Sequence, residues 1–234
     1  MIIWLASYPR SGNTLFRTVL RHRYGVNTCS VYGDAQLERE GVGEVVGNQS
    51  MEASLEQMAA AEEVYLVKTH EPPHDTNPAI YLVRDGRDAL VSHAWYTRHF
   101  GSRRWIGRLL GRCGWESILE DLITSPRQFG GWSRHVKQWC DRSALTVIVR
   151  YEDLVADPIG QVDRALAAVG CHWSPKCLEP LPAFDEFRRK SPRFFRKGKA
   201  GAWRQEMPRR LEAMFWRLHG QVMEELGYAR GLAA

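Results

Sequence analysis

The sequence has 234 residues, of which 44% are hydrophobic and 25% charged, and its formal net charge is +5. This composition is that of a soluble globular protein, and the length suits one α/β domain over residues 1–234 rather than two domains. The sequence excludes an integral membrane segment, because no apolar stretch approaches the length of a membrane span. No helix-turn-helix, zinc-finger or RNP pattern points to a nucleic-acid partner.

The first predicted element is a buried strand over Ile2–Ala6, and a helix is expected from about Thr14 to Tyr24. Between them lies the loop Ser-Tyr-Pro-Arg-Ser-Gly-Asn-Thr, at positions 7–14. A loop that enters a helix N-terminus points free backbone N–H groups and the positive end of the helix dipole at its ligand. Gly12 lets the backbone approach closely, and Arg10 adds a forked cation. The loop therefore predicts a phosphate or sulfate-ester site that is not a Walker A motif.

Further apolar runs predict parallel strands that are buried on both faces, over Val64–Lys68, Ala79–Val83 and Leu145–Val149. Amphipathic or capped segments predict helices over Met51–Glu62, Asp88–Arg98, residues 114–123, residues 132–141, Pro158–Gly170 and Pro208–Leu226. This alternation predicts a P-loop-like, doubly wound α/β fold with a mostly parallel sheet and helices on both faces. Ligands are then expected at the carboxyl ends of the strands.

Chemistry-bearing side chains follow two of these later strands. Lys68 and His70 come at the end of one, and Arg84 follows the next, with Ser92 one to two turns into the helix after it. In a parallel sheet these strand ends and the loop at positions 7–14 line one crevice. Two alternatives stay open: His70 as a structural histidine, and Arg84 in a surface ion pair with Asp85 or Asp88.

Charge is unevenly distributed along the chain. Residues 34–63 contain eight acidic residues and one basic residue, whereas residues 184–210 contain ten basic and three acidic residues. A second basic cluster consists of Arg98, Arg103, Arg104, Arg108 and Arg112. Concentrated positive charge attracts anions, although a solvated basic surface is the alternative. The acidic segment is expected near the entrance of the site, without an assigned role.

The cysteines predict a reduced, cytoplasmic protein. There are five of them, an odd number with no CxxC pair, which fits neither a disulfide framework nor a zinc site. The first residues lack the basic region and long apolar core of a signal peptide, so export is not expected.

Four segments carry a resemblance to a known family. Tyr8-Pro9-Arg10-Ser11-Gly12-Asn13-Thr14 resembles a 5′-phosphosulfate loop, and Val67-Lys68-Thr69-His70 a segment with a catalytic histidine. Residues 81–92 resemble a 3′-phosphate segment, and residues 195–203 an RKGxxGxW loop. Tyr151-Glu152-Asp153-Leu154 resembles a further segment near the adenine. In this order the motifs are similar to those of PAPS-dependent sulfotransferases of the cytosolic type, here expected in a bacterium; PAPS is 3′-phosphoadenosine 5′-phosphosulfate.

The resemblance implies that a sulfuryl group moves from PAPS to a hydroxyl of a small-molecule acceptor, with an amine as the alternative, and that 3′,5′-ADP (PAP) leaves without help from a metal. It makes His70 the general base, because an imidazole that titrates near neutral pH suits that work. It assigns Lys68 and Arg10 to the stabilisation of the negative charge that develops on the sulfuryl group. The implied donor-binding residues are Arg10, Ser11, Gly12, Asn13 and Thr14 at the 5′ end, Arg84, Ser92, Arg196, Lys197 and Gly198 at the 3′-phosphate, and Tyr151 near the adenine.

Two positions depart from the family pattern. Arg10 replaces the usual lysine, and a guanidinium with a pKa above about 12 is a poor proton donor to a leaving group. Leu15 replaces a tryptophan that packs on the adenine, so we expect another ring, Trp203, to take its place. The dimerisation motif KxxxTVxxxE is not visible, which leaves the oligomeric state open.

The acceptor region is expected within residues 93–139, where aromatic residues alternate with arginines and glycines. The aromatic residues are Trp95, Tyr96, Phe100, Trp105, Trp115, Phe129 and Trp132. The glycines predict a mobile acceptor-site lid, which would suit a natural product or a lipid-linked acceptor. The alternative is plain core packing with a solvated face.

Two other functions are weighed against this one. A P-loop-type nucleotide kinase would share the strand–loop–helix arrangement, but no GxxxxGK[ST] occurs. An inactive nucleotide-binding module would not need His70 and Lys68.

Overall fold

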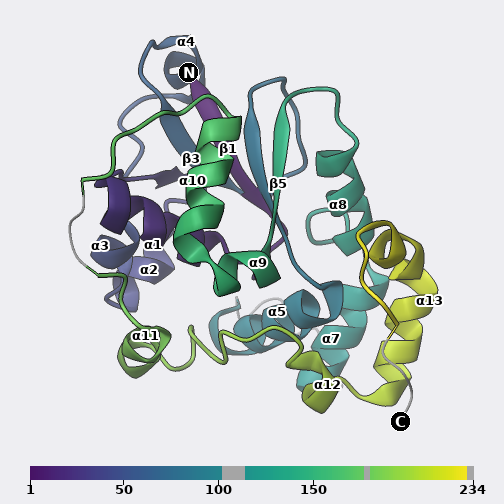
Figure 1. Ribbon diagram of the computed structural model, residues 1–234. Coiled ribbons are helices and arrows are strands. Elements are labelled where there is room, and N and C mark those ends of the chain that lie inside the picture. Colours follow the sequence, from purple (N-terminus) through teal and green to yellow (C-terminus); the bar gives the residue numbers. More distant parts are fainter. Residues whose placement is uncertain (102–113, 177–179, 231–234) are drawn as a thin grey trace.

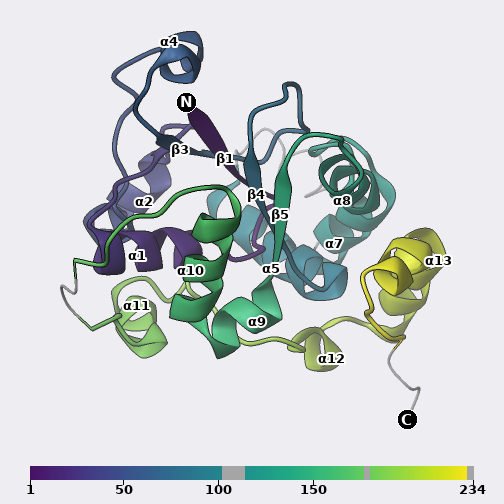
Figure 2. The same ribbon diagram turned by 45° about the horizontal axis from the view of Figure 1, so that its top comes forward.

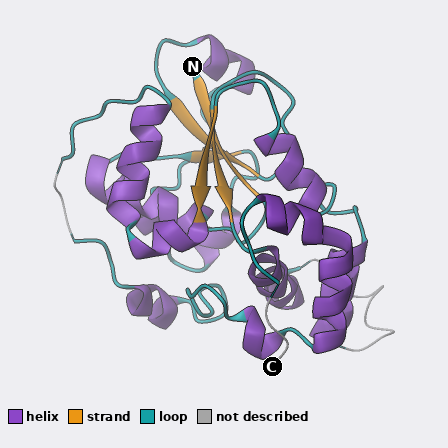
Figure 3. Cartoon of the chain, turned by 45° about the vertical axis from the view of Figure 1, so that its right-hand side comes forward, coloured by secondary structure: helices purple, strands orange, loops and turns teal. Residues whose placement is uncertain are grey.

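The computed structural model describes residues 1–101, 114–176 and 180–230. In this part of the chain five strands form one sheet, in the order β2-β3-β1-β4-β5, and every pairing is parallel. The strands are β1 (Ile2–Ser7), β2 (Cys29–Ser30), β3 (Tyr65–Thr69), β4 (Ala79–Val83) and β5 (Thr146–Arg150). Their carboxyl ends therefore meet at one edge of the sheet (Figure 3).

The helices lie between and after the strands. They are α1 (Asn13–Tyr24), α2 (Ala35–Arg39), α3 (Gly43–Val46), α4 (Leu55–Ala60), α5 (Gly86–Phe100), α7 (Trp115–Thr124), α8 (Trp132–Cys140), α9 (Tyr151–Ala156), α10 (Pro158–Ala168), α11 (Phe184–Lys190), α12 (Trp203–Glu206) and α13 (Arg209–Glu225). No helix in the described ranges is long and apolar enough to span a bilayer.

Strand β1 shows why helices cover both faces of the sheet. Successive side chains of a strand point to opposite faces. Ile2 and Trp4 belong to a core that includes residues of α5, α7, α8 and α13, whereas Ile3 and Leu5 belong to a second core with residues of α1 and α10. The two groups of helices lie on opposite sides of the strands (Figure 1 and Figure 2). The predicted doubly wound, parallel α/β fold is confirmed.

The predicted long elements are all present, and their ends differ by a few residues. Strand Ala79–Val83 matches in full, and the strand that was expected at Val64–Lys68 runs one residue later. Helix α10 begins where the sequence indicates, since the Asp157 side chain accepts a hydrogen bond from the Gly160 N–H and Pro158 occupies the first turn. The sequence did not reveal β2, α2, α3, α9, α11 and α12, because segments this short carry no readable periodicity.

Candidate active site

One cavity of about 550 Å³ lies at the carboxyl ends of the strands. It brings together twelve of the thirteen side chains that the sequence assigns to the site: Arg10, Gly12, Asn13, Thr14, Lys68, His70, Arg84, Ser92, Tyr151, Arg196, Lys197 and Gly198. Asp34 is the one carboxylate among the described residues that line it, against five arginine and lysine side chains. The cavity therefore suits an anionic ligand.

Ser11, the thirteenth, does not line this cavity. Its side chain is buried within the loop, and its hydroxyl has no hydrogen-bond partner among the described residues. Asn13 lines the cavity, but its amide Nδ2 donates to the Leu5 carbonyl at 2.9 Å. That bond fastens the start of α1 to β1, so the side chain of Asn13 orients the loop.

The loop between β1 and α1 requires glycine at position 12. Gly12 has φ 106°, and a Cβ atom there would lie 2.8 Å from the Tyr151 ring. Arg10 has φ 69°, an uncommon conformation for a residue with a side chain. The α1 N-terminus has no side-chain cap. Its first backbone N–H groups thus remain available beside the cavity.

The Arg10 guanidinium is held from several sides. Its NH2 group donates to the Phe194 carbonyl at 2.6 Å, its Nε donates to the Ser92 hydroxyl at 3.3 Å, and it lies over the Tyr96 ring. Burial, together with repulsion from Arg84 and Arg196, lowers the pKa of Arg10 to about 10. The expectation of a pKa above 12 is wrong here, although the group still carries its charge at neutral pH.

Arg84 connects the loop after β1 to the segment between α11 and α12. Its NH1 donates to the Arg10 carbonyl and its NH2 to the Lys199 carbonyl, both at 3.0 Å. The guanidinium also stacks on the Tyr151 ring, 4.1 Å from its centre. Its Nε is buried and has no partner among the described residues. An anion in the cavity could supply that partner.

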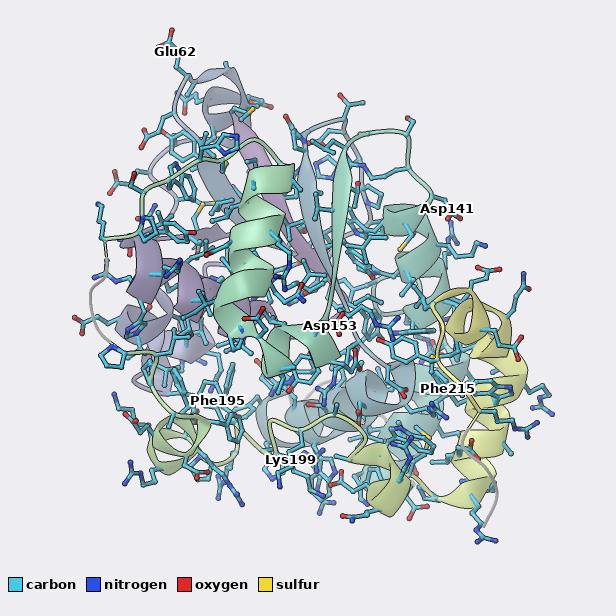
Figure 4. The ribbon with its side chains drawn as sticks, viewed as in Figure 1. Glu62, Asp141, Asp153, Phe195, Lys199 and Phe215 are labelled. Carbon is cyan, nitrogen blue, oxygen red and sulfur yellow. The ribbon has the colours of Figure 1, made fainter. Side chains whose placement is uncertain are left out.

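The segment with Arg196 and Lys197 passes beside α5, and Figure 4 labels Phe195 and Lys199 on it. The Asp88 carboxylate in α5 accepts hydrogen bonds from the backbone N–H groups of Gly201 (2.6 Å) and Trp203 (2.9 Å). Asp88 thus fixes the end of this segment to the helix that follows β4. The sequence treated Asp88 only as a possible ion partner of Arg84, to which it lies 3.9 Å away.

Arg196 and Lys197 share one carboxylate partner, Glu206 in α12. Arg196 NH1 donates to Glu206 Oε1 at 2.6 Å, and the Lys197 ammonium pairs with the same group. Burial works in the opposite direction, but hydrogen bonds from both cations lower the pKa of Glu206. The sequence gave no role to Glu206, which lies three residues after the RKGxxGxW pattern ends.

The ring of His70 has one defined tautomer. Its Nδ1 lies 2.7 Å from the Ser7 carbonyl oxygen, which can only accept a hydrogen bond. Nδ1 therefore carries the proton, and Nε2 keeps a free lone pair. The Tyr32 ring stacks on the imidazole at 5.6 Å, and Phe129 meets it edge-on at 5.7 Å.

Burial, with the nearby Lys68 ammonium, places the pKa of His70 well below 6.5. The expectation of a pKa near neutrality is thus corrected, and the ring is uncharged at neutral pH. A buried histidine holds the backbone of His70 in place. His135 Nε2 donates to the His70 carbonyl at 2.9 Å, while His135 Nδ1 lies 3.0 Å from the Tyr81 hydroxyl. The sequence did not indicate this role of His135, because its contact with His70 depends on how α8 packs on β4.

Lys68 pairs with a residue that the sequence did not assign to the site. Its ammonium lies 2.6 Å from Asp34 Oδ1, and Asp34 follows β2 in the chain. Asp34 is the first residue of the acidic segment at positions 34–63, and Gln36 and Leu37 of that segment also line the cavity. That end of the segment therefore borders the site.

Five of the seven aromatic residues of the expected acceptor region separate into two groups. Tyr96 and Phe129 line the cavity. Trp132 is fully buried against Phe215, and Trp95 stacks on Trp115, so these three indoles pack within the protein. Residues 102–113, which include Trp105 and four of the five arginines of the second basic cluster, lie outside the described residues, so the predicted lid stays a prediction.

Trp203, the ring expected to pack on the adenine, lies away from the cavity lining. Trp203 packs on the Arg87 guanidinium, 3.7 Å from its ring centre, and does not line the cavity. Leu15 does line it, and so do the phenylalanines at positions 184, 187, 194 and 195. In the described ranges no group of three or more His, Cys, Asp and Glu side chains could hold a metal ion.

Comparison with known proteins gives a consistent result. The chain matches the family described as "Sulfotransferase domain" over residues 2–227. It is 23% identical to sulfotransferase 1E1 of Mus musculus, with 94% of this chain and 83% of the relative covered. It is 22% identical to sulfotransferase 1A1 of Rattus norvegicus, with 86% and 77% covered.

Solved structures share the fold. Retinol dehydratase, in a complex with androsterone and the inactive cofactor PAP, superposes with a TM-score of 0.65 at 19% identity, covering 96% of this chain and 81% of the other. Mouse sulfotransferase SULT7A1 complexed with PAP gives a TM-score of 0.65 at 18% identity, covering 97% and 86%.

Proposed function

This chain belongs to the sulfotransferase family, whose activity is PAPS-dependent sulfuryl transfer, and we propose that its cavity transfers the sulfuryl group to a small-molecule hydroxyl with His70 as general base. An amine acceptor is the alternative. The match to residues 2–227 supports one catalytic domain over the whole chain.

The single observation that carries this mechanism is the 2.7 Å contact between His70 Nδ1 and the Ser7 carbonyl oxygen. Because Nδ1 donates to the Ser7 carbonyl, Nε2 has the lone pair that a general base needs. Nε2 takes the proton of the acceptor hydroxyl as the acceptor oxygen bonds to the sulfur and the bond from sulfur to the 5′-phosphate oxygen breaks, which releases PAP. The hydrogen bond from Nδ1 to Ser7 fixes the ring orientation and stabilises the imidazolium that forms.

Cations at two strand ends, Arg10 after β1 and Lys68 in β3, stabilise the negative charge of the transition state. Sulfuryl transfer resembles phosphoryl transfer, which depends on in-line positioning and on neutralisation of charge. The Lys68 ammonium stabilises the negative charge on the sulfuryl oxygens, and Arg10 holds the 5′ side of the donor. Arg10 binds the 5′ side of the donor and does not donate a proton to the leaving group, because its pKa of about 10 keeps the guanidinium charged.

The residues present fit PAPS, which supplies the sulfuryl group when bound. Gly12 lets the loop pack directly against the Tyr151 ring, and the buried Nε atoms of Arg84 and Arg196 have no partners among the described residues. Ser11 to Thr14 contribute backbone N–H groups at the 5′ end, and Tyr151 contributes its ring near the adenine. The residues that would hold the 3′-phosphate are Arg84, Ser92, Arg196, Lys197 and Gly198.

We propose an apolar alcohol as acceptor, a natural product or a lipid-linked molecule. Tyr32 and Phe129 flank the base, which supports an acceptor with an apolar face beside its hydroxyl. Androsterone and retinol are bound by retinol dehydratase, a protein with the same fold. We place the reaction in the cytoplasm, since Cys29, Cys140 and Cys171 form no disulfide within the described part of the chain.

Nucleotide binding tests the reaction class. PAP is expected to bind without magnesium and more tightly than ATP with magnesium, and a screen of alcohols with radiolabelled PAPS is expected to yield a labelled product. Magnesium-dependent ATP binding that exceeds PAP binding would instead indicate a kinase. PAP binding with no transfer to any phenol, sterol or long-chain alcohol would leave only a nucleotide-binding module.

The pH dependence of kcat/KM tests the base. Activity needs the unprotonated form of His70, so it falls as pH decreases through the pKa of the ring. Because burial lowers that pKa well below 6.5, the acidic limb of the profile is expected below pH 6.5. An acidic limb above pH 6.5 would contradict a buried, neutral His70 as the base.

A further inference from the structure

Asp34 links the proposed catalytic lysine to a buried arginine. Its Oδ1 lies 2.6 Å from the Lys68 ammonium, and its Oδ2 lies 2.5 Å from Arg17 NH1. The Asp34 side chain is 7% exposed and the Arg17 side chain 1%. Solvent therefore screens these contacts little. Asp34 also has φ 47°, in the left-handed region that aspartate adopts more readily than most residues with a side chain.

Arg17 gives this carboxylate a fixed support. Arg17 lies in α1, and its Nε donates to the Thr28 hydroxyl at 2.6 Å. Its NH2 donates to the Asn48 side chain at 2.7 Å and to the Thr28 carbonyl at 3.3 Å. The same helix begins at the phosphate loop. Asp34 is thus held relative to the loop that would bind the donor.

Lys68 needs such a partner for two reasons. An ammonium on a four-carbon chain is mobile unless it is bound, and mobility weakens its action on one developing charge. Burial, with repulsion from Arg17 and Arg10, lowers the pKa of Lys68, and the Asp34 carboxylate opposes that shift. The neutral His70 and the Tyr32 ring also face the ammonium.

We propose that Asp34 is a positioning residue, which holds the Lys68 ammonium beside His70 in the orientation and charge state that sulfuryl transfer requires. One of the three ammonium donors points to Asp34, which leaves two for the sulfuryl oxygens. This inference rests on the proposed function and adds a carboxylate to it, which orients the lysine before the reaction begins.

The test is a double-mutant cycle. Asp34→Asn keeps the shape of the side chain and an oxygen that can accept from Arg17, but removes the charge that holds Lys68. It is expected to lower kcat by about 10- to 100-fold, as for the loss of a charge-assisted hydrogen bond. In a Lys68→Gln background the same substitution is expected to cost nothing further, because its partner is already gone.

Three further readouts separate positioning from a general loss of structure. PAP affinity of D34N is expected to stay within about threefold of the wild type, since PAP lacks the sulfuryl group. The alkaline limb of the kcat profile is expected to move to lower pH, since the Asp34 charge no longer opposes deprotonation of Lys68. Asp34→Glu, which keeps the charge, is expected to recover part of the activity.

Asp141→Asn is the matched control. Asp141 pairs with Lys137 at 3.7 Å on the surface, after α8 and before β5, and Figure 4 shows it well away from Phe195. It is expected to keep wild-type kcat. The proposal is overturned if D34N lowers kcat equally with and without Lys68, if its alkaline limb does not move, or if D34N and D34E lose PAP binding alike. Wild-type sulfuryl transfer is measured first, so failure of the proposed function is recognised separately.

Discussion

Replacing His70 by alanine is expected to lower kcat for sulfuryl transfer by ~10²–10⁴-fold, the contribution of a positioned general base. The variant removes the Nε2 lone pair and leaves the cations of the cavity in place. Affinity for PAP is expected to stay within about threefold of the wild type, because the proposed donor contacts come from other side chains. Stopped assays with radiolabelled PAPS and isothermal titration with PAP measure the two quantities.

His172→Ala is the control for this experiment. His172 is an exposed histidine after α10, outside the residues that line the cavity, and its replacement is expected to leave kcat unchanged. The residual activity of H70A should also lose the acidic limb of the pH profile. A fall in kcat of less than about tenfold, with PAP binding intact, would show that His70 is not the base.

Replacing Arg84 by alanine has the second large expected effect, on donor affinity. If Arg84 binds the 3′-phosphate, its loss raises the Kd for PAP by about 10- to 100-fold, as for a lost charge-assisted hydrogen bond. AMP lacks the 3′-phosphate, so its Kd should change by less than about threefold. The comparison of two nucleotides separates this role from a local collapse of the loop that Arg84 also contacts.

Arg164→Ala is the matched control, because Arg164 forms an exposed ion pair with Asp157 at 3.0 Å outside the cavity lining. It is expected to bind both nucleotides like the wild type. Arg84→Lys keeps the charge but loses the forked donor, so its PAP affinity is expected to lie between that of the alanine variant and that of the wild type. Equal weakening of PAP and AMP, or a purely kinetic defect with unchanged PAP affinity, would contradict a 3′-phosphate role.

The sequence predicted the sheet and its active edge because these follow from strong local rules. Apolar runs identified four of the five described strands, and parallel strands place their carboxyl ends together. Lys68, His70 and Arg84 therefore had to share one crevice once the fold was parallel. The glycine of the loop at positions 7–14 was likewise readable, since close backbone approach requires it.

The partners of these residues could not be predicted, because they depend on tertiary packing. Asp34 follows a two-residue strand that carries no periodic signal, and 34 positions separate it from Lys68. The inward orientation of the Ser11 hydroxyl and the packing of Trp203 on Arg87 depend on contacts across the fold. Burial also changed the proton affinities of His70 and Arg10 in ways that residue type alone does not indicate.

The hydrogen bonds that the Gly201 and Trp203 N–H groups donate to Asp88 span 113 and 115 positions of the chain. Contacts of such long separation form late, since the entropy of closing the loop must first be overcome. During synthesis, a nascent polypeptide that had passed Lys190 would already contain the five described strands and the base, but not the segment with Arg196 and Lys197. On the ribosome, the pocket can therefore be completed only after that segment has been translated.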